Sequence, residues 1–575
     1  MSKKNIDLKF NKMLTTAGES LPEIPWNIYP RPQLKRDSFL CLNGEWAFGV
    51  KGEDGTLALD KKIIVPFAPE SVVSKIDTVY PDGATLVYSK KFTLPKGFNR
   101  GRVILNFGAV SQIARVYFNG NFIIEHKNGY TPFSAEVTPY LKDENIVTIE
   151  CKRTLCDLVH PYGKQSLNRG GMWYTPTSGI WQTVWLESVA NEYIKDLTFK
   201  TDENRVTITL EGVKKATLIV TTNTGEIKVK TEDGTFKFTV DSPEFWSPEN
   251  PYLYNFTVTA GKDSVQSYFA LRTLSIKEVN GVKRLLLNGK PYFFHGLLDQ
   301  GYFSDGIFTP ASPEVYTEEI KKVKALGFNT LRKHVKIEPQ VYYYDCDRLG
   351  VIVWQDMINN GDYKFMRDTV LPTIGLIRKK DKNIHKSQVH RQAFLSNMEE
   401  TVKVVKNHPS VCYYTIFNEG WGQFDSQTVY EKLKSLDDTR FIDTTSGWFF
   451  AGETDVDSRH IYFRKPKVKR SDKPIVISEF GGYVYSVKGH TFNTLKTYGY
   501  GKCDTRNQFV ERLRDLYLTA VIPAIKTGLC GTIYTQVSDV EDETNGLFTY
   551  DRKVDKITPE EFSDIATAIY EEIEK

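Results

Sequence analysis

The stretch SPEVYTEEIKKVKALGFNTL, residues 312–331, reads as a helix followed directly by a strand. Ser312 and Pro313 predict a helix start, because serine caps free backbone amides and proline suits the first helical position. Apolar side chains then recur at helical spacing from Ile320 to Leu326, and a short apolar run follows at 328–331. The stretch therefore predicts one helix–strand unit, with the helix packed on a sheet.

The same alternation continues through the C-terminal half of the chain, from about residue 277 onward. Eight apolar runs predict eight strands: Tyr292 to Leu297, Phe328 to Leu331, Val351 to Trp354, Val411 to Phe417, Phe441 to Thr445, His460 to Phe463, Ile475 to Ser478 and Gly531 to Thr535. About three hundred residues with eight βα units are typical of a (β/α)8 TIM barrel.

The N-terminal half has a different character, with short β-rich runs separated by Asn-Gly, Pro and Gly turns. A second β-rich segment begins near Ala190, and its length suits an immunoglobulin-like β-sandwich. We therefore expect three domains: a β-sandwich at 1–189, an immunoglobulin-like sandwich at 190–276 and a barrel at 277–575.

Composition narrows the class of protein. The chain has 575 residues, and its 75 basic and 71 acidic residues give a net charge of +4, so neither nucleic acid nor an anionic membrane is indicated as a partner. No segment resembles a membrane span or an export signal. The seven cysteines lack zinc or disulfide spacing, so a cytoplasmic location, no cofactor and no metal are predicted.

Polar and aromatic groups follow the predicted barrel strands, where the loops of a TIM barrel converge on the active site. Two glutamates stand out: Glu419 follows the fourth predicted strand and Glu479 the seventh. A carboxylate pair at such a mouth is the machinery of glycoside hydrolysis. The other candidate substrate-binding residues are Asn418, Asp299, Arg332, His334, Trp354, Trp421, Tyr462, Tyr534 and Gln536.

The chain resembles glycoside hydrolase family 2, the β-galactosidase, β-glucuronidase and β-mannosidase group, over nearly its whole length. The segments that carry the resemblance are Leu42-Asn-Gly-Glu-Trp-Ala-Phe48, Tyr117-Phe-Asn-Gly120, Gly179-Ile-Trp-Gln-Thr-Val-Trp185, Phe245-Trp-Ser-Pro-Glu-Asn-Pro-Tyr-Leu-Tyr254 and the two glutamate motifs. The resemblance implies that the N-terminal domain is a jelly-roll of the sugar-binding type.

The resemblance also implies roles for individual residues. Glu419 would be the acid/base and Glu479 the nucleophile of a retaining mechanism, with Asn418 holding the sugar 2-hydroxyl. Arg332 and Tyr462 would keep Glu479 ionised. His334 would contact substrate, or would be an ordinary buried histidine. Three aromatic residues are open between sugar platforms and core packing: Trp354, Trp421 and Tyr534.

The sugar is less defined than the chemistry. Family glucuronidases carry an Asn-x-Lys element after the eighth strand, whereas this chain reads Thr544-Asn-Gly-Leu-Phe-Thr-Tyr550. Without that lysine a neutral, β-D-galactoside-like glycone is favoured, unless another cation such as Lys488 replaces it. The alternatives are a β-glucuronidase, another pyranosidase, or a carbohydrate-binding protein without turnover. The partner is then a small glycoside or oligosaccharide, and a homo-oligomer is possible.

Three further segments complete the expectations. The loop after the nucleophile, 482–505, is rich in tyrosine and is the preferred wall of the sugar site, with a simple lid as the alternative. The loop 357–392, which includes Tyr363 and Phe365, is a second candidate wall. The acidic stretch 539–543 lacks calcium-loop spacing and is expected to be a solvated or hydrogen-bonding loop. His460 is left outside the predicted site.

Overall fold

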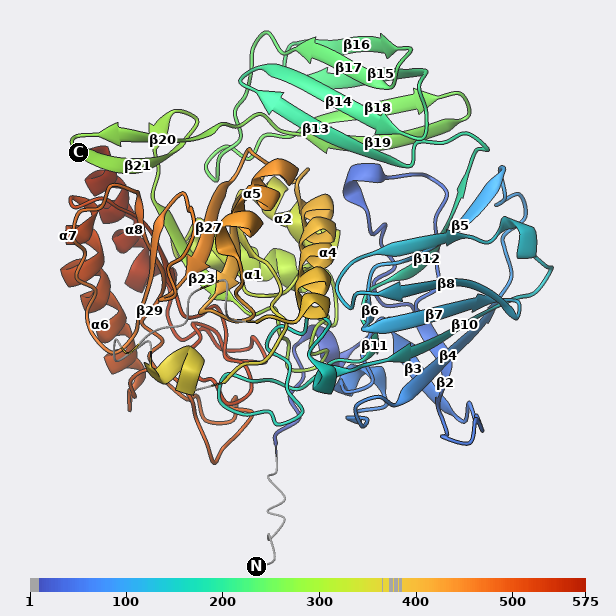
Figure 1. The fold of residues 1–575 in the computed structure, drawn as a ribbon, viewed down its shortest axis with the longest axis horizontal. Helices are drawn as coiled ribbons and strands as arrows, with labels where there is room; N and C mark the ends of the chain where they lie inside the picture. Colours follow the sequence, from blue (N-terminus) through green and yellow to red (C-terminus); the bar gives the residue numbers. More distant parts are fainter. Residues whose placement is uncertain (1–9, 365, 372–375, 377–380, 382–384) are drawn as a thin grey trace, which may run out of the picture.

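The computed structural model describes residues 10–364, 366–371, 376, 381 and 385–575. Three bodies are visible in Figure 1: a blue-to-teal β-sandwich, a green β-sandwich above it and a C-terminal barrel coloured from light green to red. No helix in the described ranges combines the length and apolar character that crossing a membrane requires.

The N-terminal domain is a jelly-roll sandwich of two main antiparallel sheets, in the orders β3-β2-β4-β10-β7-β8 and β1-β12-β5-β9, with a small β11-β6 pair. Alternating residues of these strands are buried, as a two-layer sandwich requires. The strands are β1 (Leu40–Cys41), β2 (Gly44–Lys51), β3 (Lys61–Val65), β4 (Thr85–Phe92), β5 (Arg102–Phe107), β6 (Val110–Ser111), β7 (Ile113–Phe118), β8 (Asn121–Lys127), β9 (Phe133–Glu136), β10 (Asn145–Lys152), β11 (Gly179–Ile180) and β12 (Val184–Val189).

The second domain is an immunoglobulin-like sandwich of a three-stranded sheet, β13-β14-β17, on a four-stranded sheet, β16-β15-β18-β19. A short antiparallel sheet, β20-β21-β22, then leads into the barrel. These strands are β13 (Asp196–Asp202), β14 (Arg205–Glu211), β15 (Ala216–Thr222), β16 (Gly225–Thr231), β17 (Thr235–Thr239), β18 (Tyr254–Ala260), β19 (Asp263–Phe269), β20 (Leu274–Val279), β21 (Val282–Leu287) and β22 (Lys290–Pro291).

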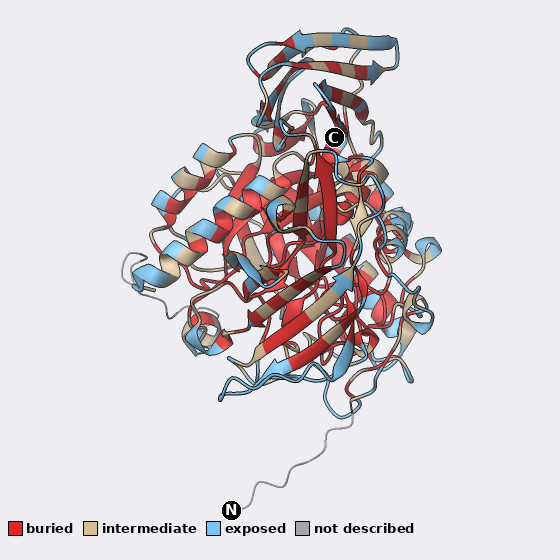
Figure 2. Ribbon diagram, turned by 90° about the vertical axis from the view of Figure 1, so that its right-hand side faces the viewer, coloured by how far each residue is buried: buried red, intermediate tan, exposed pale blue. Residues whose placement is uncertain are grey.

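The barrel is an eight-stranded parallel sheet in the order β27-β26-β25-β24-β23-β30-β29-β28, nearly closed between β27 and β28. Its strands are almost wholly buried and form the red centre of Figure 2. All eight predicted strands are present, with shifted ends: β23 (Phe294–Asp299), β24 (Thr330–Lys333), β25 (Ile352–Asp356), β26 (Val411–Asn418), β27 (Phe441–Ser446), β28 (Asp457–Ile461), β29 (Ile475–Phe480) and β30 (Leu529–Tyr534).

The outer helices follow the strands in most of the repeats. They are α1 (Glu314–Ala325), α2 (Gln340–Leu349), α4 (Gln388–Val405), α5 (Ser426–Leu436), α6 (Arg506–Leu516), α7 (Ile522–Ile525) and α8 (Pro559–Glu574). Helix α1 begins one residue later than predicted, and the Ser312 hydroxyl accepts a hydrogen bond from the Glu314 amide at 3.2 Å.

The expectation of eight complete βα units is corrected at one side of the barrel. The connections 447–456 and 462–474 contain no helix, so β27, β28 and β29 follow one another through loops alone. Both connections are short, with ten and thirteen residues, and Pro466 and Pro474 interrupt the second, which leaves little room for a helix of ordinary length.

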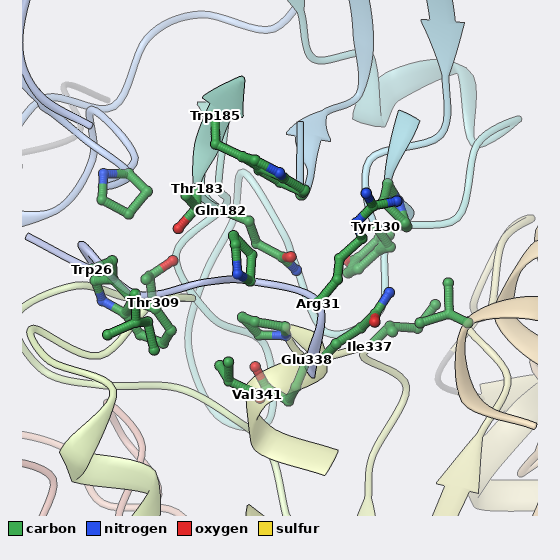
Figure 3. Close-up of a pocket in the computed structure, with 18 residues that line it drawn as sticks. Trp26, Arg31, Tyr130, Gln182, Thr183, Trp185, Thr309, Ile337, Glu338 and Val341 are labelled. Carbon is green, nitrogen blue, oxygen red and sulfur yellow. The ribbon is translucent and has the colours of Figure 1, made fainter. Parts of the chain in front are cut away.

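The jelly-roll packs closely against the barrel. Figure 3 shows a cavity at this boundary, lined by Trp26, Tyr130 and Trp185 on one side and by Ile337 and Glu338 on the other. Its volume of about 30 Å³ has room for little more than a water molecule. The two domains are therefore in close contact, and loops of the jelly-roll can take fixed positions at the barrel mouth.

Candidate functional site

The ends of two non-adjacent strands, β26 and β29, bring the two predicted carboxylates together at the barrel mouth. Glu419 directly follows β26, and Glu479 lies near the end of β29, where its backbone is in register with His460 on β28. The imidazole links the pair: its Nδ1 lies 2.8 Å from Oε1 of Glu419 and 3.6 Å from Oε2 of Glu479. The three donor atoms lie within 4.8 Å of one another. This separation fits two carboxyl groups acting on the same atom of a substrate.

Glu479 is held as an anion by its surroundings. Burial alone would raise its pKa, but the electrostatic effect of the His460, Arg332, His334 and Lys164 side chains around it lowers the pKa to about 2. Nη1 of Arg332 donates to Oε1 of Glu479 at 3.1 Å, and the Tyr462 hydroxyl donates to Oε2. One carboxylate of the pair is thus ionised and fixed in orientation.

Arg332 organises the floor of the site. It lies wholly buried on β24 and donates to Oδ1 of Asp356 at 2.9 Å, to the Ser478 carbonyl at 2.8 Å and to Oδ1 of Asn418 at 2.9 Å. The contact with Asn418 leaves the amide NH2 of that side chain available as a donor.

His334 lies beside this floor and is also buried. Its Nδ1 lies 2.7 Å from Oδ2 of Asp356, and burial lowers its pKa. A neutral ring that donates from Nδ1 to Asp356 keeps Nε2 as an acceptor.

The turn after β26 gives Glu419 an unusual backbone. Its φ is +52°, in the left-handed region that non-glycine residues seldom adopt, and its amide donates to the Ser446 carbonyl at 2.9 Å. Gly447 packs against it: a Cβ added there would lie 3.4 Å from Glu419 and 3.4 Å from Nδ1 of His460. A larger residue at 447 would crowd both side chains.

Not all predicted residues join this group. Trp354 and Tyr534 are completely buried, Trp354 with its ring centroid 3.6 Å from that of Tyr413, and Tyr534 in the packed core beside Phe480. Because their rings are enclosed by protein, we leave both out of the proposed sugar site. Asp299 forms a buried ion pair with Lys333, whose Nζ lies 2.6 Å from Oδ2, so this carboxylate already has a partner in the protein.

Trp421 and Gln536 lie at the edge of the group. The indole of Trp421 stacks on that of Trp173 with centroids 5.3 Å apart, and the Lys164 ammonium lies 4.9 Å from its centroid. Gln536, just past β30, donates to Oε2 of Glu543 at 2.7 Å. These two predicted residues support other groups around the carboxylate pair.

The tyrosine-rich loop 482–505 contributes side chains to the mouth. The ring of Tyr500 stacks on Tyr462 with centroids 3.8 Å apart, and Tyr498 packs edge-on against Tyr500 at 5.9 Å. In the loop 357–392, Tyr363 contacts Trp173 and Trp421, whereas Phe365 lies outside the described residues. Part of that second loop likewise falls outside the described ranges.

Several residues of the site were not predicted from sequence. His460 was set aside, although its place on β28, one strand from Glu479, was the available signal. The acidic stretch 539–543 is not solvated: Asp539, Glu541, Asp542 and Glu543 are all buried, so that part of the expectation is wrong and only its hydrogen-bonding part holds. Lys164, Trp173 and Tyr174 come from the jelly-roll, and no local pattern marks them.

The donor set of Glu419, His460 and Glu479 has the spacing of a metal site within the described residues. Two of the three already have partners outside the set: His460 binds Ser446, and Glu479 binds Arg332 and Tyr462. These hydrogen bonds and ion pairs balance the carboxylate charges without a metal ion, so the geometry fits a proton-transfer site at least as well.

Comparison with known proteins places this fold and site in a family. Three family models match in order: "Glycosyl hydrolases family 2, sugar binding domain" at 69–186, "Glycosyl hydrolases family 2" at 190–272 and "Glycosyl hydrolases family 2, TIM barrel domain" at 278–558. The chain belongs to glycoside hydrolase family 2.

Individual relatives are distant. A β-galactosidase of Thermoanaerobacter pseudethanolicus is 24% identical over 440 residues, covering 70% of this chain and 54% of the relative. A β-glucuronidase of Felis catus is 26% identical over 380 residues, covering 58% of this chain and 54% of the relative. The chain thus spans about half the length of these curated relatives. The solved structure of a β-D-glucuronidase from Dictyoglomus thermophilum shares the fold, with a TM-score of 0.71 and 19% identity. The match covers 95% of this chain and 98% of that chain.

Proposed function

We propose that this chain is a retaining exo-β-glycosidase that hydrolyses a terminal, neutral, β-D-galactoside-like sugar through a covalent glycosyl-enzyme. The observation that carries the proposal is the joint approach of Glu419 and Glu479 to His460, with donor atoms within 4.8 Å of one another. Retaining glycosidases have carboxyl groups about 5 Å apart, whereas inverting ones need about 6.5–9.5 Å to admit a water.

The two carboxylates would take different roles because their surroundings differ. Glu479, with a pKa of about 2, is ionised and oriented by Arg332 and Tyr462, as a nucleophile requires. Glu419 contacts only His460 through its side chain among the described residues, so it is free to exchange a proton. It would protonate the leaving oxygen and then activate water.

The floor residues would hold the sugar during this exchange. The free amide NH2 of Asn418 would donate to the sugar 2-hydroxyl, and Nε2 of His334 would accept from another hydroxyl. Such contacts strengthen as positive charge develops on the sugar ring, so they favour the transition state over the bound substrate.

Two observations support a neutral sugar. The segment after β30 lacks the lysine that would pair with a sugar carboxylate, and it contributes the buried carboxylate of Glu543 close to the site. A uronide is the enzyme-class alternative, since the solved relatives include a β-glucuronidase and a β-galacturonidase. A binding protein without turnover is the non-enzymatic alternative, but binding alone requires no such carboxylate pair.

A panel of p-nitrophenyl β-glycosides tests this proposal. We expect turnover of the galactoside above that of the glucoside, mannoside, glucuronide and galacturonide. Proton NMR of the first product formed should show the β-anomer, as retention requires. Turnover of the uronides alone would reject the proposed sugar, the α-anomer would reject retention, and sugar binding without any turnover would reject the enzyme.

A further inference from the structure

A segment of the jelly-roll, residues 162–175, lies on the barrel loops and is fixed there by several bonds. The Tyr162 hydroxyl donates to the Gly361 carbonyl at 2.8 Å, and the Thr175 amide donates to Oε1 of Glu541 at 2.8 Å. Arg169 forms an ion pair with Glu541 at 2.8 Å. This segment is therefore a fixed part of the barrel mouth, although it belongs to another domain.

Lys164 in this segment carries a nearly buried charge. It is 8% exposed, and its Nζ lies over the ring of Trp421. Within the described part of the chain, Nζ forms no ion pair within 4 Å of a carboxylate and no hydrogen bond. Its positive charge nevertheless lowers the pKa of Glu479 and of Glu543, so it lies near both. The stem of this side chain is enclosed, while its ammonium has the Trp421 ring as a neighbour and donates to no protein acceptor in the described residues, so it can donate to a ligand oxygen.

Glu543 is the second group at this place, and it comes from the barrel. Its Oε2 accepts from the Tyr174 hydroxyl at 3.0 Å and from Nε2 of Gln536 at 2.7 Å. Gln300 in turn donates to Oε1 of Gln536 at 2.8 Å, which fixes the orientation of that amide. The other oxygen of Glu543, Oε1, accepts no hydrogen bond from the described residues. One acceptor is thus held in place without a donor.

Glu543 also lies close to the candidate catalytic pair. The negative charge of Glu479 raises its pKa, and the charges of both Glu419 and Glu543 raise the pKa of Tyr498 and of Tyr500. The backbones of Tyr498 and Glu543 form a bridge. The Tyr462 hydroxyl, which donates to Glu479, also lies 3.2 Å from the Thr535 hydroxyl, and Thr535 directly precedes Gln536 in the chain. The carboxylate pair, the tyrosine wall and Glu543 therefore lie together at the barrel mouth.

We propose that Lys164 and Glu543 are specificity-determining residues that bind hydroxyl groups of the glycone, Nζ donating to a hydroxyl oxygen and Oε1 accepting a hydroxyl proton. The inference rests on the proposed function and assigns the side chains that determine its specificity for the sugar. A hydroxyl donates and accepts, so it satisfies both residues. Above the pKa of Glu543, which is raised to about 7, this side chain is ionised, so a sugar carboxylate satisfies Lys164 but leaves Oε1 of Glu543 without a donor and adds a like charge beside it; the comparison is therefore made at pH 8.

The test compares Glu543→Gln and Lys164→Met with the wild-type chain on the galactoside, glucuronide and galacturonide. The glutamine variant keeps the shape of Glu543, removes its charge and supplies a donor. We expect its kcat/KM to fall about tenfold on the galactoside while the ratio of uronide to galactoside activity rises about tenfold. Lys164→Met should lower kcat/KM about tenfold on the galactoside. It should also raise the inhibition constant of free galactose, because the product binds less tightly.

Matched controls separate specificity from structure. Lys488→Met removes the alternative cation in the exposed part of loop 482–505, and Glu571→Gln removes an exposed carboxylate of α8; both should stay within about twofold of wild type. Equal losses on all three glycosides, or unchanged ratios in an active Glu543→Gln variant, would overturn the inference. If that variant does not fold, Lys164→Gln provides the same comparison.

The proposed sugar and this inference can fail separately. A wild-type chain that prefers uronides contradicts the proposed sugar, whatever the variants do. A wild-type chain that prefers the galactoside, with variants that keep that preference unchanged, contradicts only the assignment of Lys164 and Glu543.

Discussion

Nδ1 of His460 lies 2.8 Å from Oε1 of Glu419, and the hydrogen bonds behind the ring fix its tautomer. The Ser478 hydroxyl donates to the Arg459 carbonyl, and the Ser446 hydroxyl donates to Ser478 at 3.0 Å. Nε2 of His460, 2.8 Å from Ser446, must therefore carry a proton and donate it. Nδ1 then faces Glu419, at the position where the proposed acid/base would exchange a proton.

This arrangement predicts that His460 positions the acid/base. In His460→Gln, the ring can no longer share a proton with Glu419, so kcat should fall about 10- to 100-fold on glycosides with poor leaving groups and much less on activated ones. The pH profile of kcat should change shape as well. Ser446→Ala, which removes the hydrogen bonds of that hydroxyl to Nε2 of His460 and to Ser478 but leaves the ring beside Glu419, should lose less than about tenfold; an equal loss would assign His460 a purely structural role.

Replacing the proposed nucleophile should stop the reaction at its first step. Glu479→Ala is expected to lose at least about 10⁴-fold in kcat, because no glycosyl-enzyme can form. Added azide should restore part of the turnover and give the α-glycosyl azide, detectable by NMR. Activity close to wild type would remove Glu479 from that role.

Replacing the proposed acid/base should make the leaving group decisive. Glu419→Ala should hydrolyse methyl or phenyl glycosides about 10²- to 10⁴-fold more slowly, while dinitrophenyl glycosides, which leave without a proton, are spared in their first step. A plot of log(kcat/KM) against leaving-group pKa measures this, and parallel lines for variant and wild type would contradict the assignment.

The buried carboxylates Glu479 and Glu543 predict opposite dependences of stability on pH. The pKa of Glu479 is lowered to about 2 from an ordinary 4.5, so its ionised form stabilises the fold above pH 4.5, and this contribution is lost as pH falls toward 2. Glu479→Gln should therefore melt below wild type at pH 7, by the equivalent of about 2–3 kcal/mol, and the gap should narrow at pH 4.

For Glu543, burial raises the pKa to about 7, so the protonated form is favoured in the fold and stability is lost as pH rises from 4.5 through 7. The difference in melting temperature between Glu543→Gln and the wild type should therefore be more favourable to the variant at pH 8 than at pH 5. Melting temperatures of both variants at pH 4, 5, 7 and 8 measure these trends, and a common sign for the two would contradict the assigned environments.

Most barrel strands were predictable because they are buried on both sides and read as apolar runs. Their ends were less so: β26 continues to Asn418, since the ladder with β27 extends to Ser446. Strand β28 is polar and mostly half-buried, and the prediction started it three residues too late. The absence of helices between β27, β28 and β29 was not predicted. The fold was inferred from a regular βα repeat, and that inference assigns a helix to every unit.

The candidate site divides in the same way. Arg332, Asn418, Glu419, Tyr462 and Glu479 could be grouped from sequence, because each lies at or just past the same end of a parallel barrel. The contact between Tyr174 and Glu543 joins residues 369 positions apart in two domains. It depends on how the jelly-roll docks, and no local periodicity encodes docking. Trp354 and Tyr534 could not be decided between sugar platforms and core packing, because burial of an aromatic residue is not visible in its own sequence neighbourhood.

The placement of residues 162–175 on the barrel separates two tasks between two folding units. The proposed catalytic groups lie at the ends of barrel strands, whereas part of the surface beside them is supplied by a loop of the jelly-roll. Substitutions in that loop can alter which sugar is accepted without disturbing the strands beneath. A barrel produced on its own would keep its two glutamates but lose the side chains that residues 162–175 place beside them. The proposed site therefore depends on both domains.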